Sequence, residues 1–467
     1  MAEDRSRWIS EQVRIAREHV SADGLLPFQD LLNSERVAQV IRETGGPWRK
    51  CGWSAQLTVW TFLLQVLSPD HSCRDAVARV RMHQLSLGQL PVGTQTGPYC
   101  KARQRLPEAL PLELARQTGA ELDRCVARSR TFLGGRPLKL VDGTIVSMPD
   151  TPANQREYPQ PESQAPGLGF PHARLVVLLS LHSGAARDVA IAPYAGKETG
   201  ETALFRQMFD GLERGDIVVG DTYFGNWWTI AMLQARGVDI VVPLHQLRTC
   251  DFGDGFGLGF EDHIVSWPKP ARPEWMDDET YHSLPKELIV RELGVHSYDP
   301  STRVDDMILV TTLLDPTVAP AHQVSQAYLW RWDSESDLKS LKCSLQMDVL
   351  RCKTPEMVRK EISMHLLAYN LIRTVMAESA AEYQIEPRGL SFKGAMQSIN
   401  AFRSSAVLTP PGELPLLYDD LLGMIASHPV RNRPHRVEPR AVKRRPKCLK
   451  LLTVPRSVAR TLCPESG

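Results

Sequence analysis

The stretch LKLVDGTIVSM, residues 138–148, is where the pattern of this chain changes from helix to strand. The preceding GGRP, residues 134–137, ends the helical pattern. The Leu, Val and Ile residues of the stretch favour a β-strand, yet Asp142 lies in the middle of it. Acids are poor strand residues, so an aspartate inside a strand and next to Gly143 indicates a functional side chain.

The residues after this strand alternate in a way that is typical of an α/β fold. Strands are expected at residues 173–181, 187–194, 216–221 and 238–244, and helices at 198–212 and 226–237. The strand at 216–221 has an apolar centre without alternation, so we expect it to be central and buried. It ends on Asp221, and ligands of open sheets gather beyond the carboxyl ends of such strands. An acid at a strand end is common by itself, but central neighbouring strands would bring Asp142 and Asp221 together.

A pair of neighbouring carboxylates indicates a cation between them, because like charges repel. Oxygen ligands without a nitrogen or sulfur cluster favour Mg²⁺ or Mn²⁺. A third acid on a flanking helix, Glu335, would complete a site for two metal ions, an arrangement that supports phosphoryl chemistry.

The helix expected around Glu335 has the sequence YLWRWDSESDLKSLK, residues 328–342. At about 100° of rotation per residue, five of its side chains fall within about 80° of one face. These five are Tyr328, Arg331, Glu335, Lys339 and Lys342. A neighbouring stripe is expected to pack on the core and contains Leu338, Leu341 and Leu345. The polar face is either a ridge that suits a metal-bound phosphate or a solvated face with pairs such as Glu335 to Lys339.

Residues 1–132 are predicted to be helical, with SRWISEQVRIAREHV (6–20) and AQLTVWTFLLQVL (55–67) at helical spacing. A basic cluster there fits a DNA-binding unit or a plain helical bundle and comprises Arg79, Arg81, Lys101, Arg103 and Arg105. Gly- and Pro-rich turns at 250–305 predict a β-rich insertion, after which a strand at 305–315 returns to the sheet. A long amphipathic helix is expected after Pro355.

Composition favours a globular, intracellular protein. The 467 residues are 42% hydrophobic and carry a net charge of +1, so no global field indicates a nucleic-acid partner. The charge is uneven, because residues 431–460 hold eleven Lys or Arg and one acid, which fits a phosphate-binding, solubilising or address-signal tail. The nine cysteines show no zinc spacing, and a reducing compartment is expected. The longest largely apolar run, 175–181, is too short to span a membrane.

The chain resembles the IS4 family of DDE transposases. Family members carry Tyr, two residues, Arg, three residues, Glu, six residues and Lys, which Tyr328, Arg331, Glu335 and Lys342 match in spacing. VDGT with Asp142 and GDTYF with Asp221 match the first and second acid motifs, and DTPANQREYPQP (150–161) and ARGVDIVVPLH (235–245) also look like the family. The resemblance covers about residues 95 to 455.

The resemblance implies an RNase H-like mixed sheet flanked by helices, with a β-rich insertion and a helical N-terminal domain. It implies cut-and-paste transposition, in which two Mg²⁺ or Mn²⁺ ions on Asp142, Asp221 and Glu335 support nicking, and the freed 3′-hydroxyl attacks the opposite strand or target DNA. Tyr328, Arg331 and Lys342 would hold phosphates, and Lys339 would add another contact. The implied partners are terminal inverted repeats, target DNA and a second copy of the chain, in the bacterial cytoplasm at the nucleoid.

The implied division is 1–132, helical and DNA-binding; 133–249 and 306–385, the two parts of the core; 250–305, the insertion; and 386–467, the C-terminal region with the basic tail. Some relatives stack a flipped base on a tryptophan of the insertion, where this chain has Met307, so Trp267 and Trp275 are either substitutes or core residues. The alternatives are an RNase H-like nuclease that does not join strands and an inactive DNA-binding remnant. The presence of all three acids argues against the remnant.

Overall fold

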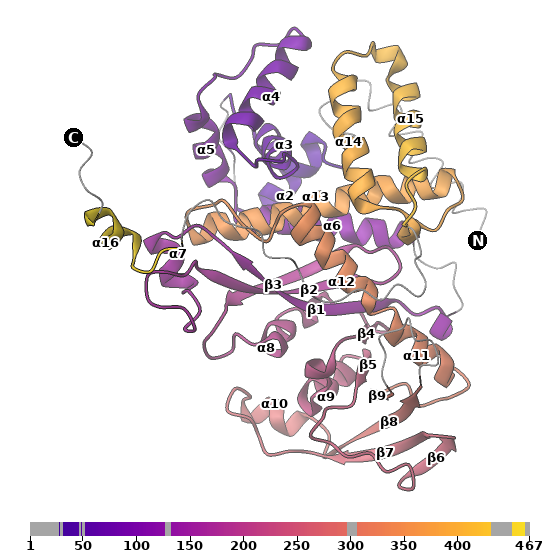
Figure 1. Cartoon of the computed structure of the whole chain (residues 1–467). Helices are drawn as coiled ribbons and strands as arrows, with labels where there is room; N and C mark the ends of the chain where they lie inside the picture. The colour runs from indigo at the N-terminus through magenta and orange to yellow at the C-terminus, as the bar shows by residue number, and fades with distance from the viewer. Residues whose placement is uncertain are drawn as a thin grey trace.

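The computed structural model describes residues 28, 31–45, 48, 52–126, 132–296, 306–430 and 451–462. Within these residues one mixed sheet runs through the protein, in the order β3-β2-β1-β4-β5-β9-β8-β7-β6 (Figure 1). Its strands are β1 (Leu138–Ser147), β2 (His172–Ser180), β3 (Ala186–Pro193), β4 (Ile217–Val219), β5 (Asp239–Pro243), β6 (Phe256–Gly259), β7 (Asp262–Pro268), β8 (Glu287–Val295) and β9 (Met307–Thr311). The five strands expected from residue 138 to residue 244 are confirmed.

The pairing of the first five strands is that of an RNase H-like core. β1 and β3 both pair antiparallel with β2, whereas β4 is parallel to β1, and β5 is parallel to β4. The expected central position of the strand at 216–221 is confirmed, because β4 lies between β1 and β5 and its three residues are fully buried. The predicted α/β fold class is therefore confirmed.

Helices cover both faces of the sheet. Leu138 and Leu140 of β1 pack in one core with α6 (Ala109–Val126) and α13 (Pro355–Glu382), the long helix expected after Pro355. Val141 faces the opposite core, which α8 (Glu201–Arg206) and α9 (Trp227–Ala235) complete. In Figure 1, α6 and α13 lie above the sheet, and α8 and α9 lie below it. Alternate residues of β1 thus reach opposite layers, as the period of a strand requires.

The N-terminal region contains α2 (Ser34–Thr44), α3 (Ala55–Val66), α4 (Cys73–Ser86) and α5 (Thr96–Arg105); α2 packs on α6 and α3 on α13, while α4 and α5 pack on α3 (Figure 1). The expected helix at 55–67 is confirmed as α3, whereas the one at 6–20 lies outside the described residues. The basic cluster is not uniformly exposed. Arg103 is 9% exposed, donates to Gln65 Oε1 at 2.9 Å and lies over the ring of Phe62, so it belongs to the packing of these helices.

The insertion extends the sheet. β9 pairs with β5 on one side and with β8 on the other, so β6, β7 and β8 continue the same surface, with α10 (Asp278–Ser283) beside them. A fully buried Arg291 donates to Asp262 at 2.6 Å and to the Ala319 carbonyl at 2.6 Å, which joins β7, β8 and the segment after β9. Of the two tryptophans considered for base stacking, Trp267 is a core residue, since it is 4% exposed.

Two expected helices differ from the structure. The helix predicted at 198–212 begins only at Glu201, because Glu198 adopts a positive φ of 56° that no helix continues. It ends at Arg206 and is followed by the short turn η2 (Phe209–Gly211). The helix predicted around Glu335 is three pieces: α11 (Ala321–Leu329), α12 (Trp332–Lys339) and a π-helical turn, η4 (Ser340–Ser344).

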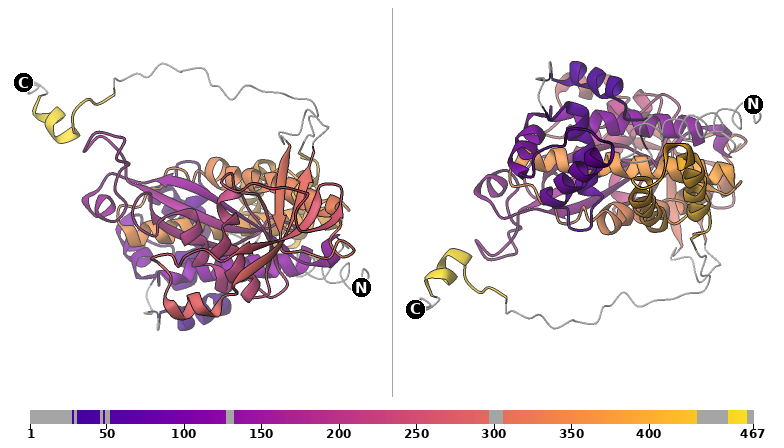
Figure 2. Two further views of the ribbon diagram at one scale, coloured as in Figure 1. Left: turned by 90° about the horizontal axis from the view of Figure 1, so that it is seen from below. Right: turned by 90° about the horizontal axis from the view of Figure 1, so that it is seen from above.

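The C-terminal region contains α14 (Phe392–Ala406) and α15 (Leu414–Ala426), and α16 (Arg456–Thr461) follows later. Figure 2 shows α16 beside the loop after α7 (Pro152–Glu157), away from α14 and α15. Most of the basic tail, residues 431–450, lies outside the described residues. The remaining short turns are η1 (Phe132–Gly135), η3 (Thr222–Gly225), η5 (Pro387–Gly389) and η6 (Pro411–Glu413). No helix among the described residues is both long and apolar enough to cross a membrane.

Candidate active site

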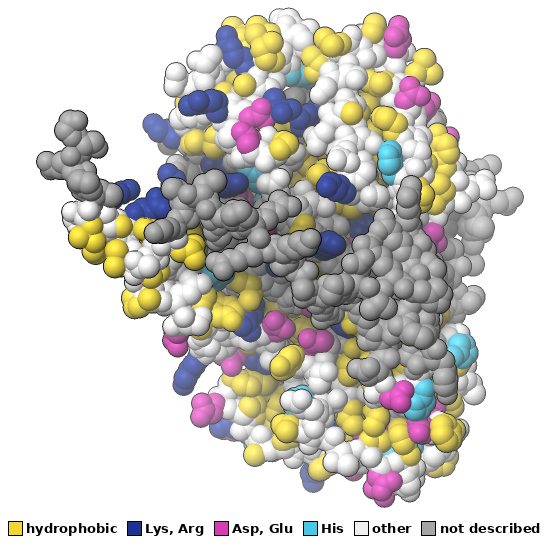
Figure 3. All heavy atoms as spheres, in the orientation of Figure 1, with side chains coloured by type: hydrophobic (Ala, Val, Ile, Leu, Met, Phe, Trp, Pro, Cys, Tyr) yellow, Lys and Arg dark blue, Asp and Glu magenta, His cyan; other side chains and the backbone are white. Residues whose placement is uncertain are grey.

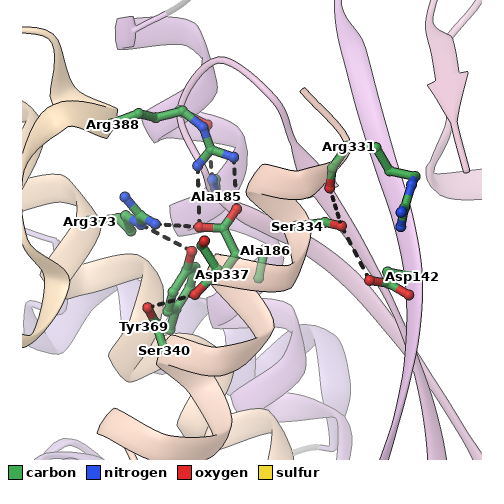
Figure 4. Close-up of polar contacts among 12 residues, drawn as sticks. Asp142, Ala185, Ala186, Arg331, Ser334, Asp337, Ser340, Tyr369, Arg373 and Arg388 are labelled. Atoms are coloured by element: carbon green, nitrogen blue, oxygen red, sulfur yellow. Dashed lines mark hydrogen bonds and ion pairs between the residues drawn. The ribbon is translucent and has the colours of Figure 1, made fainter. Parts of the chain in front are cut away.

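Asp142 lies in the middle of β1, on the same side of the strand as Leu138 and Leu140, and faces α12. Its Oδ1 accepts a hydrogen bond from the Gly143 backbone N–H at 2.8 Å. The Ser334 hydroxyl of α12 lies 2.7 Å from the Arg331 carbonyl oxygen and 3.2 Å from Asp142 Oδ2 (Figure 4). Burial raises the pKa of Asp142, since a desolvated carboxylate is less stable than one in water.

Asp221 lies two residues beyond β4 and caps η3, where its Oδ1 accepts from the Tyr223 N–H at 2.9 Å. The parallel register pairs Leu140 of β1 with Val219 of β4. Asp142 lies two residues after Leu140 and Asp221 two residues after Val219, so the two aspartates stand side by side. Burial raises the pKa of Asp221, and its charge in turn raises the pKa of Asp142. The two acids are close, as the sequence predicts.

Arg331 lies at the junction of α11 and α12, and its guanidinium interacts electrostatically with Asp142, Asp221 and Glu335. Its Nη2 is 3.7 Å from Glu335 Oε1, and its positive charge acts on Asp142 and Asp221, where it lowers both pKa values against the larger effect of burial. Figure 4 shows its side chain extending on the side of Asp142. The predicted pair of Glu335 with Lys339 is replaced by the pair with Arg331. Within the described residues, the buried Arg331 Nε has no hydrogen-bond partner.

The other residues of the predicted ridge occupy different environments. Tyr328 is 5% exposed, so the expectation that its phenol stands on an exposed ridge is wrong. It is buried because it belongs to α11, which packs in the main core, and the guanidinium of Arg331 lies 5.6 Å from its ring centroid. Lys339 is exposed at the end of α12, and Lys342 is half-buried in the π-helical turn. The leucine stripe at Leu338, Leu341 and Leu345 is buried, as predicted.

Asp337 holds α12 in place, a role that was not predicted from the sequence. It is 1% exposed and accepts from Arg373 of α13 and from Arg388, whose Nη2 is 2.8 Å from Oδ2 (Figure 4). Its position two residues after Glu335 sets it about 200° away from that glutamate on the helix. An acid on the far side of the ridge, beside the leucine stripe, was the available signal that it would be buried and paired with cations.

A fourth carboxylate, that of Glu201, also belongs to the cluster. It begins α8 and approaches β1 from the face opposite α12, where a Cβ at Gly143 would lie 2.4 Å from its Cδ. Burial raises the pKa of Glu201, and the charges of Asp221 and Asp142 raise it further. The glycine after Asp142 was the signal for this close approach, but no pattern in the sequence connects residue 143 with residue 201.

The chain is similar to known transposases. The family model described as "Transposase DDE domain" matches residues 133–371, more than half of the chain. The transposase InsG of insertion sequence element IS4 from Escherichia coli strain K12 is 25% identical over 435 residues, covering 90% of this chain and 92% of that protein. A cryo-EM structure of the piggyBac transposase synaptic complex with hairpin DNA aligns with a TM-score of 0.42 and 10% identity, covering 85% of this chain and 84% of that one. This protein therefore belongs to the DDE transposases of the IS4 family, enzymes that cleave DNA and transfer its strands.

Proposed function

We propose that Asp142, Asp221 and Glu335 hold two Mg²⁺ or Mn²⁺ ions and form the catalytic centre of a cut-and-paste DNA transposase. The observation that carries this assignment is the register of β1 and β4, which sets the two aspartates side by side below α12. DDE transposases use divalent metal ions, and the cluster fits them. Its donors are all carboxylate oxygens, and burial raises the pKa of both aspartates, which a cation would reverse.

When bound, the ions would supply an activated water and stabilise the entering and leaving oxygens of an in-line displacement. The protein's own residues hold the acids in position: Ser334 donates to Asp142, and Asp337 fixes the helix that carries Glu335. Nicking at the element's end would free a 3′-hydroxyl, which would then attack the opposite strand or the target DNA. The substrates would be the terminal inverted repeats and a target site, with two copies of the chain acting together.

The cations beside the acids suit a polyanionic substrate. Arg331 presents a planar guanidinium, a group that binds a phosphate oxygen pair bidentately, and it lies beside the three acids, so it would hold a phosphate of the scissile strand. Tyr328 would position the Arg331 guanidinium. Lys339 and Lys342, one and two turns beyond Glu335, would contact phosphates further along the strand.

DNA outside the catalytic centre would contact the N-terminal helices, the insertion and the basic tail. Figure 3 shows Lys and Arg side chains over the upper left of the molecule, where α4 and α5 lie in Figure 1. We assign DNA binding to residues 1–132, catalysis to 133–249 with 306–385, support of the DNA end to the insertion at 250–305, and a salt-sensitive phosphate contact to the basic tail in 386–467.

The decisive experiment changes Asp142, Asp221 and Glu335 singly to Ala and incubates each protein with Mg²⁺ and DNA carrying the element's ends. Metal-assisted catalysis supplies several kcal/mol, so cleavage should fall by about 10³-fold or more. DNA binding in a gel-shift assay should persist. Near wild-type cleavage by any one variant would remove that acid from the centre. A second assay with pre-cut ends separates a transposase, which joins them to target DNA, from a nuclease, which does not.

A further inference from the structure

Three side chains far apart in the sequence meet at one point of the insertion. Cys250 lies in the loop after β5, His263 in β7 and Glu292 opposite it in β8. The Cys250 Sγ is 3.6 Å from His263 Nε2, and this nitrogen is 3.2 Å from Glu292 Oε2. The three atoms all lie within 4.8 Å of one another. Cys250 and His263 are 13 residues apart in the sequence, and His263 and Glu292 are 29 residues apart, so no short Cys/His motif marks this cluster.

The hydrogen bond on the other side of the imidazole limits what can lie between these atoms. His263 Nδ1 is 2.7 Å from the carbonyl oxygen of Asp254, and a carbonyl can only accept, so Nδ1 carries a proton. In a neutral imidazole, Nε2 then carries no proton, and its lone pair points toward the Glu292 carboxylate and the Cys250 sulfur. Two acceptors at 3.2 Å repel unless a cation stands between them. That cation is either a proton, carried by Nε2 or by the Glu292 carboxyl, or a metal ion.

The surroundings are those of a metal site. A ligating histidine usually donates its second N–H to a carbonyl or carboxylate, as His263 does to Asp254. Glu292 is oriented too, because Trp267 Nε1 donates to its Oε1 at 2.9 Å and leaves Oε2 directed at His263. His263 is 1% exposed and Glu292 is 4% exposed, whereas Cys250 is half-exposed. Cys250 is therefore the member of the cluster that lies nearest the surface.

We propose that Cys250, His263 and Glu292 bind one Zn²⁺ ion, with a water molecule as fourth ligand. Sulfur, nitrogen and oxygen together form a donor set that Zn²⁺ accepts in tetrahedral geometry. A thiolate and a carboxylate neutralise its two charges. The ion ties the loop at 244–255 to β7 and β8. This loop leaves the sheet at the end of β5, the same edge at which β4 ends before Asp221, so the ion fixes a segment next to the catalytic edge.

A second cluster, made of His71, Glu361 and His365, is a weaker candidate for the same ion. Glu361 already accepts from the backbone N–H groups of Arg351 and Cys352, at 3.0 and 2.8 Å. Neither ring nitrogen of His365 has a hydrogen-bond partner within the described residues, so nothing orients this imidazole toward a metal. This second cluster is nevertheless an alternative location for the zinc ion, and the experiment must distinguish the two clusters.

The test uses the full chain purified without chelator, with metal content measured by mass spectrometry after gel filtration. The wild type should carry about one Zn²⁺ per chain, and Cys250→Ser and Glu292→Gln should lose it. Cys343→Ser, which alters an exposed free cysteine, and His365→Leu should keep it. Circular dichroism checks that each variant is folded. Zinc that persists in Cys250→Ser and disappears in His365→Leu would overturn the assignment.

A spectroscopic measurement reads the thiolate directly. Protein stripped by chelator and reloaded with Co²⁺ should show the near-ultraviolet absorption of a thiolate bound to Co²⁺, and Cys250→Ser should abolish that band. Trp267→Phe removes the donor that orients Glu292 and should weaken metal affinity about 10- to 100-fold without changing the stoichiometry. A wild type that binds neither zinc nor Co²⁺ would show that a proton stands between His263 and Glu292. Binding of Co²⁺ without the thiolate band would also contradict the proposal.

Discussion

On the side of α12 that faces α13, the carboxylate of Asp337 is matched by the guanidinium groups of Arg373 and Arg388. On the side that faces the sheet, Asp142, Asp221 and Glu335 gather around the guanidinium of Arg331. Asp337 is 1% exposed, whereas the side chain of Glu335, two residues earlier, is 49% exposed. One short helix thus carries two acids in opposite electrostatic environments.

The difference separates structural acids from functional ones. A buried carboxylate with two cations has its charge and its hydrogen bonds satisfied, so it fixes a position in the fold. The acids on the other side outnumber the cation beside them, and Glu201 adds to the excess. Such a cluster is unfavourable by itself and is retained where a ligand supplies the missing positive charge. Substitutions on the Asp337 side should therefore change the free energy of unfolding, whereas substitutions on the side that faces the sheet should change the rate of DNA cleavage.

The largest effect is expected for Asp337→Ala. This change leaves Arg373 and Arg388 without their buried partner, and breaking a buried ion pair costs about 3–5 kcal/mol. The free energy of unfolding, measured by denaturant titration, should fall by that amount. Glu335→Ala is the matched control, because its acid is half-exposed in the same helix and its loss should abolish cleavage while leaving stability nearly unchanged. Equal stability losses in the two variants would refute the distinction.

The next effect concerns the cation of the functional side. Arg331→Lys keeps the charge but removes the planar fork that contacts a phosphate bidentately. Loss of a charge-assisted hydrogen bond costs about 1.5–3 kcal/mol, so strand cleavage or joining should slow by about ten- to a hundredfold. Arg214→Lys, an exposed position just before β4 and therefore at the opposite edge of the sheet, is the control. Wild-type rates for both products in Arg331→Lys would return Arg331 to a purely structural role.

How far the sequence predicts this site depends on the range of the contacts. Asp142 and Asp221 could be predicted because apolar runs define β1 and β4 locally and parallel strands end at one edge. The ridge was predicted only in part. Helical periodicity fixes angles around an axis, but the burial of Tyr328 depends on how α11 packs in the core.

Glu201, Asp337 and the insertion cluster could not be found in this way. Each depends on a partner that is distant in the sequence, such as Gly143 for Glu201 and Arg373 for Asp337. The residue types alone were uninformative, since a glutamate at the start of a helix and an aspartate in its middle are common on solvated surfaces. Tertiary packing, which periodicity does not encode, decides which of them are buried.

A smaller effect is expected at Ser334, which bridges the helix and the sheet. Its hydroxyl contacts Asp142 Oδ2 at 3.2 Å and is fully buried. Ser334→Ala removes the hydrogen bond that holds the Asp142 carboxylate in position, and such a bond contributes about 0.5–1.5 kcal/mol. Cleavage should therefore slow by about two- to tenfold. Ser336→Ala, an exposed serine of the same helix, should leave the rate unchanged. If the two alanine variants cleave at the same rate, Ser334 does not position Asp142.

The smallest effect should appear in the metal-free protein as a dependence of its stability on pH. Burial raises the pKa of Asp221 above its value in the unfolded chain. The folded state therefore favours the neutral carboxyl, and the stability that this provides is complete below the unfolded pKa and is lost as the pH rises through the folded one. Asp221→Asn is neutral at every pH, so in chelator at pH 7 it should melt on the order of 2 °C above the wild type. The difference should shrink toward pH 4, and Asp337→Asn should instead melt lower. Thermal melts of the three proteins across this range provide the measurement, and a wild type that melts above Asp221→Asn at pH 7 without metal would show that the cluster is not short of positive charge.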